Sequence, residues 1–588
     1  MAQPVTIGID LGTTKCLAAL SNSDLVKGGS YADDGIVWIE LASDLQADRS
    51  LGTTGFQPSA ADAGFLPSVF CYHNNTRLIG RQAIRREQIE DRVTAVRNAK
   101  RFMGISSNAV LETCGQRFSP QDVLAEFLKC IRLAATEQFR KSPSLLKDMW
   151  TLDGTEVTHA VITIPAQFGF REREQTRQAA KIAGFSACEF LVEPMAAAFG
   201  LGVHLQPSGT RVMIIDVGGG TTDICLLRVG TKGSFHELGR VGDNQHGGVD
   251  WDVAIATHAL EQAFDNASID EEEYIRRVVS FDNSGSTFSS DRAGHAAEGP
   301  LLQLSELTKL MLSSKGTDQP FSLRERPNGK VRYLDARITA SWFTEESAEL
   351  SDWVANLANR LVRQIAEADR LAHPPRIPLS WDDVDQIHVV GGGARIAGVI
   401  DALRRHVPNL NQKLQDGAGD PQVLVAKGAA VFAELRACGS DTAAISEARV
   451  PHDIGIYSPR SKKFLCLLPA NTKVLRRRSL DLTLSNPNAK NLPLVIAERR
   501  FRRGHAEGEI YPIKKQRLRI DDWTKGLSGW NAVKKWFGHL PNTVNIELSV
   551  DKELGIEFTF RYGGKVVELA NLTKDDIAAA TEIILDHD

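Results

Sequence analysis

Two stretches of the chain, about 200 residues apart, share the same succession of apolar and polar positions. Residues 5–20 alternate in a way that predicts two strands joined by a tight turn at 11–14. Residues 211–229 repeat this order, with strands at 211–215 and 223–229 around a second turn. Strand, acidic residue, Gly/Thr turn and strand thus occur twice, which indicates two related lobes.

The rest of the first 440 residues reads as a mixture of helices and buried strands, so we expect an α/β fold. Ser119 and Pro120 form a start signal for a helix that runs to about residue 140. Glycine- and serine-rich stretches predict an insertion at about 22–64 and a loop at 284–296. The other expected elements are strands at 159–164 and 387–390 and helices at 170–183, 351–372 and from about 396.

After about residue 440 short alternating segments replace the helical periodicity. They predict an all-β module at 455–570, after a linker at 441–454 and before a short helix within 571–588. An insertion at 521–541 carries four large aromatic residues, for which packing is favoured over a binding surface. The expected strands are 464–468, 480–484, 492–498, 544–550 and 555–560.

Composition excludes several classes of protein. The 588 residues carry a formal net charge of -4, so no basic excess indicates a nucleic-acid partner, and short basic runs at 476–478 and 499–503 are interpreted as solvated faces. The N-terminus lacks the pattern of a secretory signal, and no apolar run has the length of a membrane span. Eight scattered cysteines without metal-ligand spacing are typical of a reducing compartment. We therefore expect a cytoplasmic protein without a membrane partner.

The two turns have the chemistry of a phosphate site. Backbone N–H groups approach phosphate closely where the residues are glycine or small and hydroxylated. Carboxylates also lie beside both turns: Asp10 at the first, Asp216 and Asp223 at the second. Because carboxylate and polyphosphate repel without an intervening cation, Asp10 and Asp223 are predicted to hold Mg²⁺ through water. The predicted phosphate-binding residues are Gly12, Thr13, Thr14, Gly218, Gly219, Gly220 and Thr221.

One Gly-Thr hairpin beside an aspartate is more often an ordinary turn, but two copies in the same order are improbable by chance. Neither turn continues into the Gly-Lys-Ser/Thr of a P-loop. Neither opens a helix as the dinucleotide-binding fingerprint does, since a strand follows each. A further glycine turn at 391–393 is weak evidence alone.

Together the motifs resemble the 70-kilodalton heat-shock chaperone family, within the actin/hexokinase-like ATPases. The resemblance covers about 5–435 strongly and about 450–570 weakly. It implies a two-lobed, actin-like (ribonuclease H-like) ATPase domain over 1–440, followed by a β-sandwich-like module. The motifs are 7–14 (IGIDLGTT), 99–104 (AKRFMG), 161–168 (VITIPAQF), 192–198 (VEPMAAA), 216–223 (DVGGGTTD), 247–252 (GGVDWD), 306–314 (ELTKLMLSS) and 389–395 (VVGGGAR).

The resemblance implies a role for each matching position near the phosphates. Asp10 and Asp223 would organise Mg²⁺, with K⁺ as an additional ion. Thr13, Thr14 and Lys15 would hold β/γ-phosphate oxygens, and Thr221 would contact the γ-phosphate. Lys100 would stabilise the attacking water and the γ-phosphoryl charge, and Glu193 would position that water.

Other matches would bind the nucleoside or transmit its state. Glu306, Lys309 and Ser313, at i, i+3 and i+7 of one helix, would line the adenosine pocket. Arg395 would stack on adenine beyond the turn that contains Gly391 and Gly392. The resemblance also implies an interdomain switch formed by Pro165 and Arg173.

Each assignment has a plainer alternative. Lys100 and Arg101 could be a solvated helix end, and Glu193 before a proline could belong to a turn. Glu306 and Lys309 could form a surface ion pair worth a few tenths of a kcal/mol. Only the joint pattern favours the functional interpretation.

Departures from the family pattern put parts of the expectation in doubt. Val249 and Gln422 stand where acidic residues are usual, and Met195 replaces a threonine. Residues 443–451 lack the family's acidic, leucine-rich linker, so the usual coupling between domains does not follow from the resemblance. The long helical lid is also missing, which suggests a divergent, bacterial-type, lidless member.

The resemblance implies an ATP-dependent molecular chaperone that hydrolyses ATP to ADP slowly. Hydrolysis would be coupled to an unfolded peptide or a dedicated client, with a J-domain co-chaperone and a nucleotide exchange factor as further partners. The alternative is a nucleotide-sensing scaffold that binds a protein partner with little turnover. A small-molecule kinase is disfavoured by the Lys100 motif and by the β-rich module.

Overall fold

The computed structural model divides the chain into two compact units. The first comprises Met1–Phe168 and Glu172–Ser446, and the second comprises Gly169–Arg171 and Glu447–Asp588. The boundary at Ser446 falls inside the segment expected to be a linker. The structure describes residues 3–22, 35–41, 64–90, 93–104, 110–146, 149–279, 299–325, 331–370, 376–415, 420–443, 445–446, 449–457, 462–472, 477–483, 491–502, 505–519, 543–550, 556–562, 565–567 and 570–571.

The first unit contains two large sheets, and each defines one lobe. In lobe I the strand order is β12-β11-β2-β3-β4, with β5 also paired to β3. In lobe II the order is β18-β13-β14-β15-β19. The lobe I strands are β2 (Thr6–Leu11), β3 (Lys15–Ser21), β4 (Ile36–Trp38), β5 (Leu66–Pro67), β11 (His159–Ile164) and β12 (Ala187–Val192). The lobe II strands are β13 (Arg211–Val217), β14 (Thr222–Val229), β15 (Phe235–Asp243), β18 (Gln386–Val390) and β19 (Ile445–Ser446).

The two sheets repeat one topology. In lobe I the antiparallel pair β2–β3 has β11 as a parallel neighbour of β2. In lobe II the antiparallel pair β13–β14 has β18 as a parallel neighbour of β13. Each hairpin therefore has the same position relative to its parallel neighbour, with its glycine turn at the same strand end. The internal repeat predicted from the sequence is confirmed at the level of the fold.

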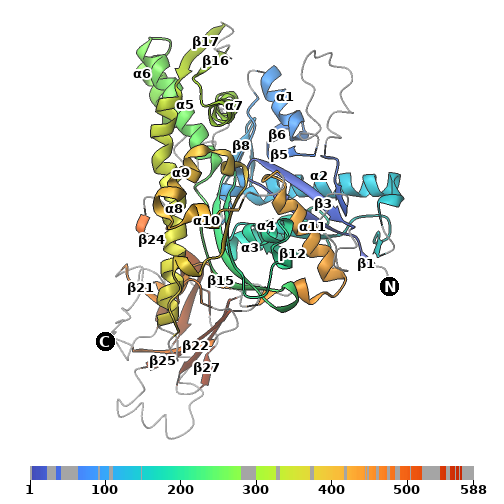
Figure 1. The fold of residues 1–588 in the computed structure, drawn as a ribbon, viewed down its shortest axis with the longest axis vertical. Coiled ribbons are helices and arrows are strands. Elements are labelled where there is room, and N and C mark those ends of the chain that lie inside the picture. Colours follow the sequence, from blue (N-terminus) through green and yellow to red (C-terminus); the bar gives the residue numbers. More distant parts are fainter. Residues whose placement is uncertain are drawn as a thin grey trace. The chain divides into compact units, whose positions relative to one another are not determined.

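Helices surround the two sheets (Figure 1). α4 and α11 pack against each other, and α11 packs against β2, β3 and β11. The start signal at Ser119 is confirmed, because its hydroxyl accepts a hydrogen bond from the Asp122 N–H and caps α2. The helices are α1 (Arg81–Ile89), α2 (Pro120–Lys141), α3 (Phe170–Ile182), α4 (Glu193–Gly200), α5 (Gly248–Asp265), α6 (Glu271–Val279), α7 (Gly299–Lys315), α8 (Ala340–Arg370), α9 (Ala397–His406), α10 (Leu410–Lys413) and α11 (Leu424–Ala437).

Short two-stranded ribbons complete the first unit. They pair β1 with β10, β6 with β7, β8 with β9 and β16 with β17. Their bounds are β1 (Gln3–Pro4), β6 (Phe70–His73), β7 (Thr76–Ile79), β8 (Leu111–Thr113), β9 (Gln116–Phe118), β10 (Trp150–Thr151), β16 (Gln319–Glu325) and β17 (Arg332–Ile338). In the described part of the chain, no helix has both the length and the apolar character needed to span a membrane.

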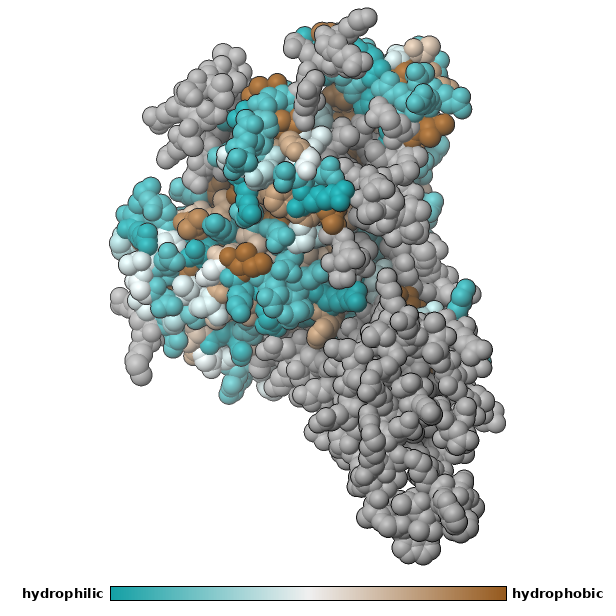
Figure 2. All heavy atoms as spheres, turned by 180° about the vertical axis from the view of Figure 1, so that it is seen from behind, coloured by the Kyte–Doolittle hydropathy of each residue, from teal (hydrophilic) through white to brown (hydrophobic). Residues whose placement is uncertain are grey.

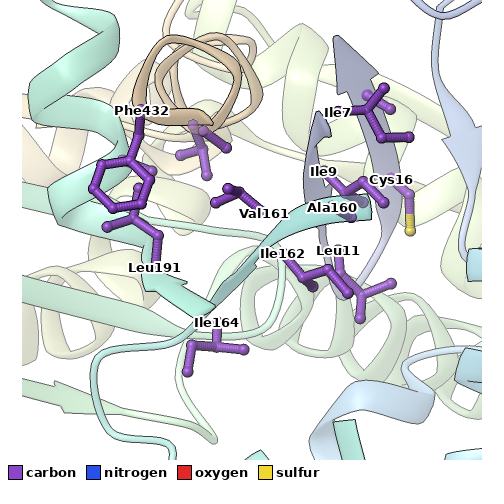
Figure 3. Close-up of a cluster of buried hydrophobic side chains, with 14 of the residues drawn as sticks. Ile7, Ile9, Leu11, Cys16, Ala160, Val161, Ile162, Ile164, Leu191 and Phe432 are labelled. Carbon is purple, nitrogen blue, oxygen red and sulfur yellow. The ribbon is translucent and has the colours of Figure 1, made fainter. Parts of the chain in front are cut away.

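Successive side chains of β13 point to opposite faces of the sheet and belong to two different hydrophobic cores. Val212 and Ile214 of β13 belong to the core of lobe I, whereas Met213 and Ile215 belong to the core of lobe II. Figure 3 shows side chains of the first core, in which Ile9 of β2 is the strand partner of Ile162 of β11, and Ile7 is the partner of Ala160. Because both faces of β13 are covered, the hairpin that it starts has a rigid base. On the coloured surface in Figure 2, hydrophobic residues form separate patches among hydrophilic ones.

The second unit is β-rich over its described residues. One sheet has the order β21-β20-β23-β24-β28 and the other β22-β25-β26-β27. The strands are β20 (Asp453–Tyr457), β21 (Phe464–Leu468), β22 (Arg477–Thr483), β23 (Asn491–Arg502), β24 (His505–Arg519), β25 (Thr543–Val550), β26 (Ile556–Tyr562), β27 (Lys565–Val567) and β28 (Ala570–Asn571). The predicted change to all-β structure is confirmed. The aromatic insertion at 521–541, the helix within 571–588, the loop at 284–296 and most of 22–64 lie outside the described residues.

Candidate functional site

The two glycine turns lie against each other. A Cβ atom added to Gly219 would lie 2.5 Å from the Thr14 Oγ1 atom, and one added to Gly220 would lie 2.6 Å from the Thr13 Oγ1 atom. Threonines from lobe I therefore contact glycines from lobe II directly. The two hairpins, distant in sequence, contribute to a single site, and glycine is needed at both positions for this approach.

A buried ion pair lies beside these turns. The Lys100 Nζ atom is 2.5 Å from the Glu193 Oε1 atom, and both side chains are buried. Lys100 comes from a 3₁₀ turn, Ala99–Phe102, and Glu193 is the first residue of α4. A helix N-terminus favours a carboxylate at this position.

Three aspartates surround this pair. Asp10 is the last residue but one of β2, and Asp216 and Asp223 lie directly opposite each other on β13 and β14. Electrostatic interactions link each of these carboxylates to Lys100 and Glu193. Asp10 also accepts a hydrogen bond from the Thr163 hydroxyl at 3.3 Å. The site thus combines four carboxylates with one ammonium group.

This excess of negative charge changes the titration of the aspartates. Burial, and then the nearby Glu193 carboxylate, raises the pKa of Asp10 to about 7 and that of Asp223 to about 8. The same two causes raise the pKa of Asp216 well above its ordinary value. Burial disfavours the Lys100 ammonium, but Glu193 and Asp10 outweigh it and raise the pKa of Lys100. An added cation would favour the ionised aspartates.

The arrangement fits a hydrated cation. Asp223 Oδ1 accepts a hydrogen bond from the Ala166 N–H at 2.7 Å, whereas Asp223 Oδ2 is buried and has no hydrogen-bond partner among the described residues. Such an oxygen can accept a hydrogen bond from a metal-bound water. Within the described chain, no three Asp, Glu, His or Cys side chains are placed to bind a metal directly. The Asp223 Oδ2 atom could therefore contribute to holding Mg²⁺ through one of its waters.

Lys15 connects the first turn with the residues predicted to bind the nucleoside. Its ammonium donates a hydrogen bond to the Gln422 side-chain oxygen and lies 4.1 Å from the centre of the Phe65 ring. Burial lowers the pKa of Lys15, and the negative charge of Glu306 opposes this effect. Arg395, which also acts electrostatically on Lys15, forms a half-exposed ion pair with Asp420 at 2.8 Å. Glu306, Arg395 and Lys15 are therefore brought together.

The other predicted nucleoside residues have different surroundings. Lys309 is buried and bound within lobe II, to Asp252 at 2.7 Å and the Gly248 carbonyl at 2.8 Å. The Ser313 hydroxyl is buried and has no hydrogen-bond partner among the described residues. Gly391 has a φ of 80°, and a Cβ atom there would lie 2.5 Å from the Val217 carbonyl oxygen, whereas one on Gly392 would meet open space.

Pro165 and Arg173 meet at Phe168. The Phe168 N–H donates to the Pro165 carbonyl at 3.1 Å, and Arg173 Nε donates to the Phe168 carbonyl at 2.9 Å. Because Ala166 donates to Asp223, this turn is also attached to the acidic cluster.

The sequence analysis left three residues of this site without a role. Asp216 was recognised as a carboxylate beside the second turn but was not assigned to the site. Arg101 was treated only as part of a helix end, and Gln422 only as a departure from a pattern. A strand register pairs Asp216 with Asp223, but the contacts of Arg101 and Gln422 depend on tertiary structure that no local pattern records.

Comparisons with known proteins agree with this geometry. The model of a family described as "Hsp70 protein" matches residues 60–282, a range that contains Lys100, Glu193 and the second glycine turn. "Chaperone protein DnaK" of Metamycoplasma hominis is 26% identical over 499 residues, which are 85% of this chain and 70% of that protein. "Chaperone protein DnaK" of Mycoplasmopsis agalactiae is 25% identical over 498 residues, 85% and 69% of the respective chains.

The similarity to DnaK extends over most of the chain, beyond the part that the family model matches. The two-lobed α/β unit with paired glycine hairpins and the β-rich second unit agree with an actin-like ATPase domain followed by a β-sandwich. Over most of its length the chain is therefore similar to chaperones of the Hsp70 family, from which it is divergent in sequence.

Proposed function

We propose that this chain binds Mg²⁺ and ATP between its two glycine turns, hydrolyses the nucleotide slowly, and uses the cycle to control binding of an unfolded peptide or a dedicated client. The observation that carries the proposal is the Lys100–Glu193 pair, buried among three aspartates beside the contact of the two turns. The site brings groups of opposite charge together beside the two glycine turns. This arrangement suits phosphoryl transfer, because positioning and charge stabilisation supply most of the catalysis of that reaction.

Lys100 and Glu193 have complementary tasks in this proposal. The Lys100 ammonium stabilises negative charge that develops on the γ-phosphoryl oxygens and on the attacking water. The Glu193 carboxylate accepts a hydrogen bond from that water and orients it. Their mutual contact at 2.5 Å holds both groups in place before the nucleotide arrives, so little reorganisation is needed.

The aspartates and turns hold the phosphates. Bound Mg²⁺ supplies positive charge that neutralises the β/γ-phosphate oxygens. Asp10, Asp216 and Asp223 orient its waters, and the free Oδ2 atom of Asp223 is one acceptor for them. Potassium can occupy the same acidic surroundings. Thr13, Thr14 and Lys15 hold phosphate oxygens from lobe I, and residues 218–221 hold them from lobe II.

The nucleoside is assigned to the residues around Lys15. Glu306 and the Ser313 hydroxyl, which has no hydrogen-bond partner in the described part of the chain, bind the ribose through hydrogen bonds, and Arg395 stacks on the base after leaving Asp420. Gly392, where an added Cβ would meet open space, gives the ligand close access to the backbone, and Gly391 allows the turn to pack closely against Val217. Lys309 acts indirectly, because its bonds to Asp252 and to the Gly248 carbonyl fix α7 on α5.

Nucleotide state is proposed to reach the rest of the protein through the turn that follows β11. Asp223 binds the N–H of Ala166, which directly follows Pro165. A change in the charge or position of Asp223 would therefore shift Pro165. Arg173 would move with it, because Phe168 is hydrogen-bonded to both residues. The β-rich unit would respond by changing its affinity for client, with a J-domain co-chaperone and a nucleotide exchange factor setting the timing.

The test is ATP turnover by the purified full-length chain, with and without a panel of unfolded peptides. The proposal predicts slow basal hydrolysis that a binding peptide accelerates. Tight nucleotide binding without hydrolysis, and without any effect of peptide, would instead support a nucleotide-sensing scaffold. Failure to bind ATP at all would refute both functions.

A further inference from the structure

Three consecutive carbonyl groups of the second glycine turn are held from outside the turn. The Gly218 carbonyl accepts a hydrogen bond from the Gly248 N–H at 2.9 Å, and the Gly219 carbonyl accepts one from the Val249 N–H at 2.7 Å. Both donors belong to the first turn of α5, in the same lobe. The third carbonyl, that of Gly220, accepts instead from Arg101 Nε at 2.9 Å. Arg101 belongs to lobe I.

These bonds fix the direction of the turn's N–H groups. In a trans peptide the N–H points away from the carbonyl of the same peptide unit. Holding the Gly220 carbonyl therefore aims the Thr221 N–H to the opposite side, as α5 does for the two preceding peptides. Among the described residues, the N–H groups of Gly219, Gly220 and Thr221 have no backbone acceptor. Three parallel donors of this kind form an anion-binding nest.

Arg101 is held tightly while it does this. Its side chain is buried, and its NH2 atom lies 2.5 Å from Asp250 Oδ2. Asp250 also caps α5 by accepting the Gly247 N–H at 2.7 Å. The Arg101 carbonyl in turn accepts a hydrogen bond from the Gln245 side chain at 3.0 Å. Side chain and backbone of Arg101 are thus both bound to lobe II.

Arg101 directly follows Lys100 in the same 3₁₀ turn. A displacement of Arg101 therefore moves Lys100, and separation of the lobes would release the Gly220 carbonyl. One residue consequently sets two features of the site: the orientation of the third peptide of the nest and the position of the ammonium group opposite it. The α5 donors cannot do this, because they come from the same lobe as the turn.

We propose that Arg101 is a positioning residue that orients the Thr221 N–H toward the γ-phosphate and brings it into register with Lys100. The inference rests on the proposed ATP-binding function and deepens it. Because only ATP carries the γ-phosphate, Arg101 contributes to ATP affinity more than to ADP affinity. It thereby makes this contact between the lobes selective for the triphosphate.

The experiment measures the ratio of the ATP and ADP dissociation constants by calorimetry for the wild type and Arg101→Lys. Lysine keeps the charge but cannot bind the Gly220 carbonyl and Asp250 together as a guanidinium does. We expect ATP affinity to fall about tenfold with ADP affinity nearly unchanged, and the turnover number to fall by a similar factor. An unchanged ratio in Arg101→Lys would overturn the role of Arg101.

A matched control exists elsewhere in lobe I. Arg132 Nε donates to the Ala183 carbonyl at 2.8 Å, and its NH1 atom lies 2.7 Å from Glu156 Oε2, so it combines the same two kinds of bond. Arg132→Lys should lower thermal stability without changing the ATP/ADP ratio. An equal change of the ratio in both variants would show a general structural effect and overturn the proposal.

A second variant covers the case in which Arg101→Lys does not fold. Asp250→Asn removes the ion pair but leaves the Arg101–Gly220 bond and a cap for Gly247. We expect a shift of the ATP/ADP ratio in the same direction, about threefold, and no shift would overturn the proposal. If the wild type binds ATP and ADP but the substitutions do not change the ratio of the two affinities, this inference alone is refuted. If the wild type binds neither nucleotide, the proposed function and the inference are refuted together.

Discussion

Thr13 of the first glycine turn lies directly against Gly220 of the second, so closely that a Cβ atom on Gly220 would lie 2.6 Å from the Thr13 hydroxyl oxygen. The two residues come from different lobes and are more than 200 positions apart. Their contact means that the two phosphate-binding turns form one structure. A ligand held by one turn is therefore necessarily close to the other.

Gly220→Ala should weaken ATP binding by forcing the turns apart. The added methyl group overlaps the Thr13 side chain, and overpacking of this kind typically costs about 1–3 kcal/mol. Calorimetry should show an ATP affinity about tenfold lower or more. Gly64→Ala is the control, because its Cβ would lie 3.4 Å from Leu17 Cδ1, an ordinary contact. Equal ATP affinity in both variants would speak against a joint site.

Lys100→Ala should abolish most ATP hydrolysis while the protein still binds ATP. Loss of one preorganised group that stabilises transition-state charge typically costs about 100- to 1,000-fold in turnover number. Single-turnover hydrolysis, with binding measured separately, distinguishes the two effects. Lys141→Ala, which removes an exposed ammonium paired with Glu137 on α2, should hydrolyse ATP like the wild type. Normal turnover by Lys100→Ala would show that the catalytic assignment is wrong.

The contribution of Asp10 and Asp223 to the stability of the nucleotide-free protein should fall as the pH rises from about 4 to about 8. Asp10 and Asp223 have folded-state pKa values of about 7 and about 8, against an ordinary value of 3.8. Within this window the folded chain retains protons that the unfolded chain has released, so the free energy of unfolding decreases with pH. The stabilisation is complete below the unfolded pKa and is lost as the pH passes through the folded values.

Asp223→Asn isolates this effect, because asparagine stays neutral at every pH. The stability of this variant minus that of the wild type should be larger at about pH 8.5 than at about pH 5. Thermal unfolding of both proteins in the presence of a chelator measures this difference. Asp401→Asn, which removes an exposed carboxylate paired with Arg404, should follow the wild-type profile. Parallel profiles for Asp223→Asn and the wild type would contradict the raised pKa.

The hairpins and the main helices could be predicted because their signals are local. Alternation of apolar residues indicated β13 and β14, and the Ser119 cap marked the start of α2 within one residue. The expected helix at 351–372 is longer in the structure, because α8 begins at Ala340. Its first turns contain Trp342 and Phe343, whose burial against the lobe II core supports helix without a strong start signal.

The site was only partly predictable, because several of its contacts join residues far apart in sequence. The glycine turns and Lys100 could be recognised from their motifs. The pairing of Lys309 with Asp252 depends on how α7 and α5 are placed in three dimensions, and that of Lys15 with Gln422 on the placement of β3 and the segment before α11. Arg101 lies in the same motif as Lys100, but the motif does not indicate its partner, and only the fold brings it to the Gly220 carbonyl.

The most direct test is a calorimetric titration of the full-length chain with ATP, in the presence and absence of Mg²⁺. Asp10→Asn and Asp223→Asn are measured in the same way, since each removes a carboxylate from a different lobe. The account predicts one ATP per chain in the wild type, tighter binding with Mg²⁺, and loss of the Mg²⁺ effect in both variants. An ATP affinity that is the same with and without Mg²⁺, or that depends on only one of the two aspartates, would contradict a single site formed by both lobes.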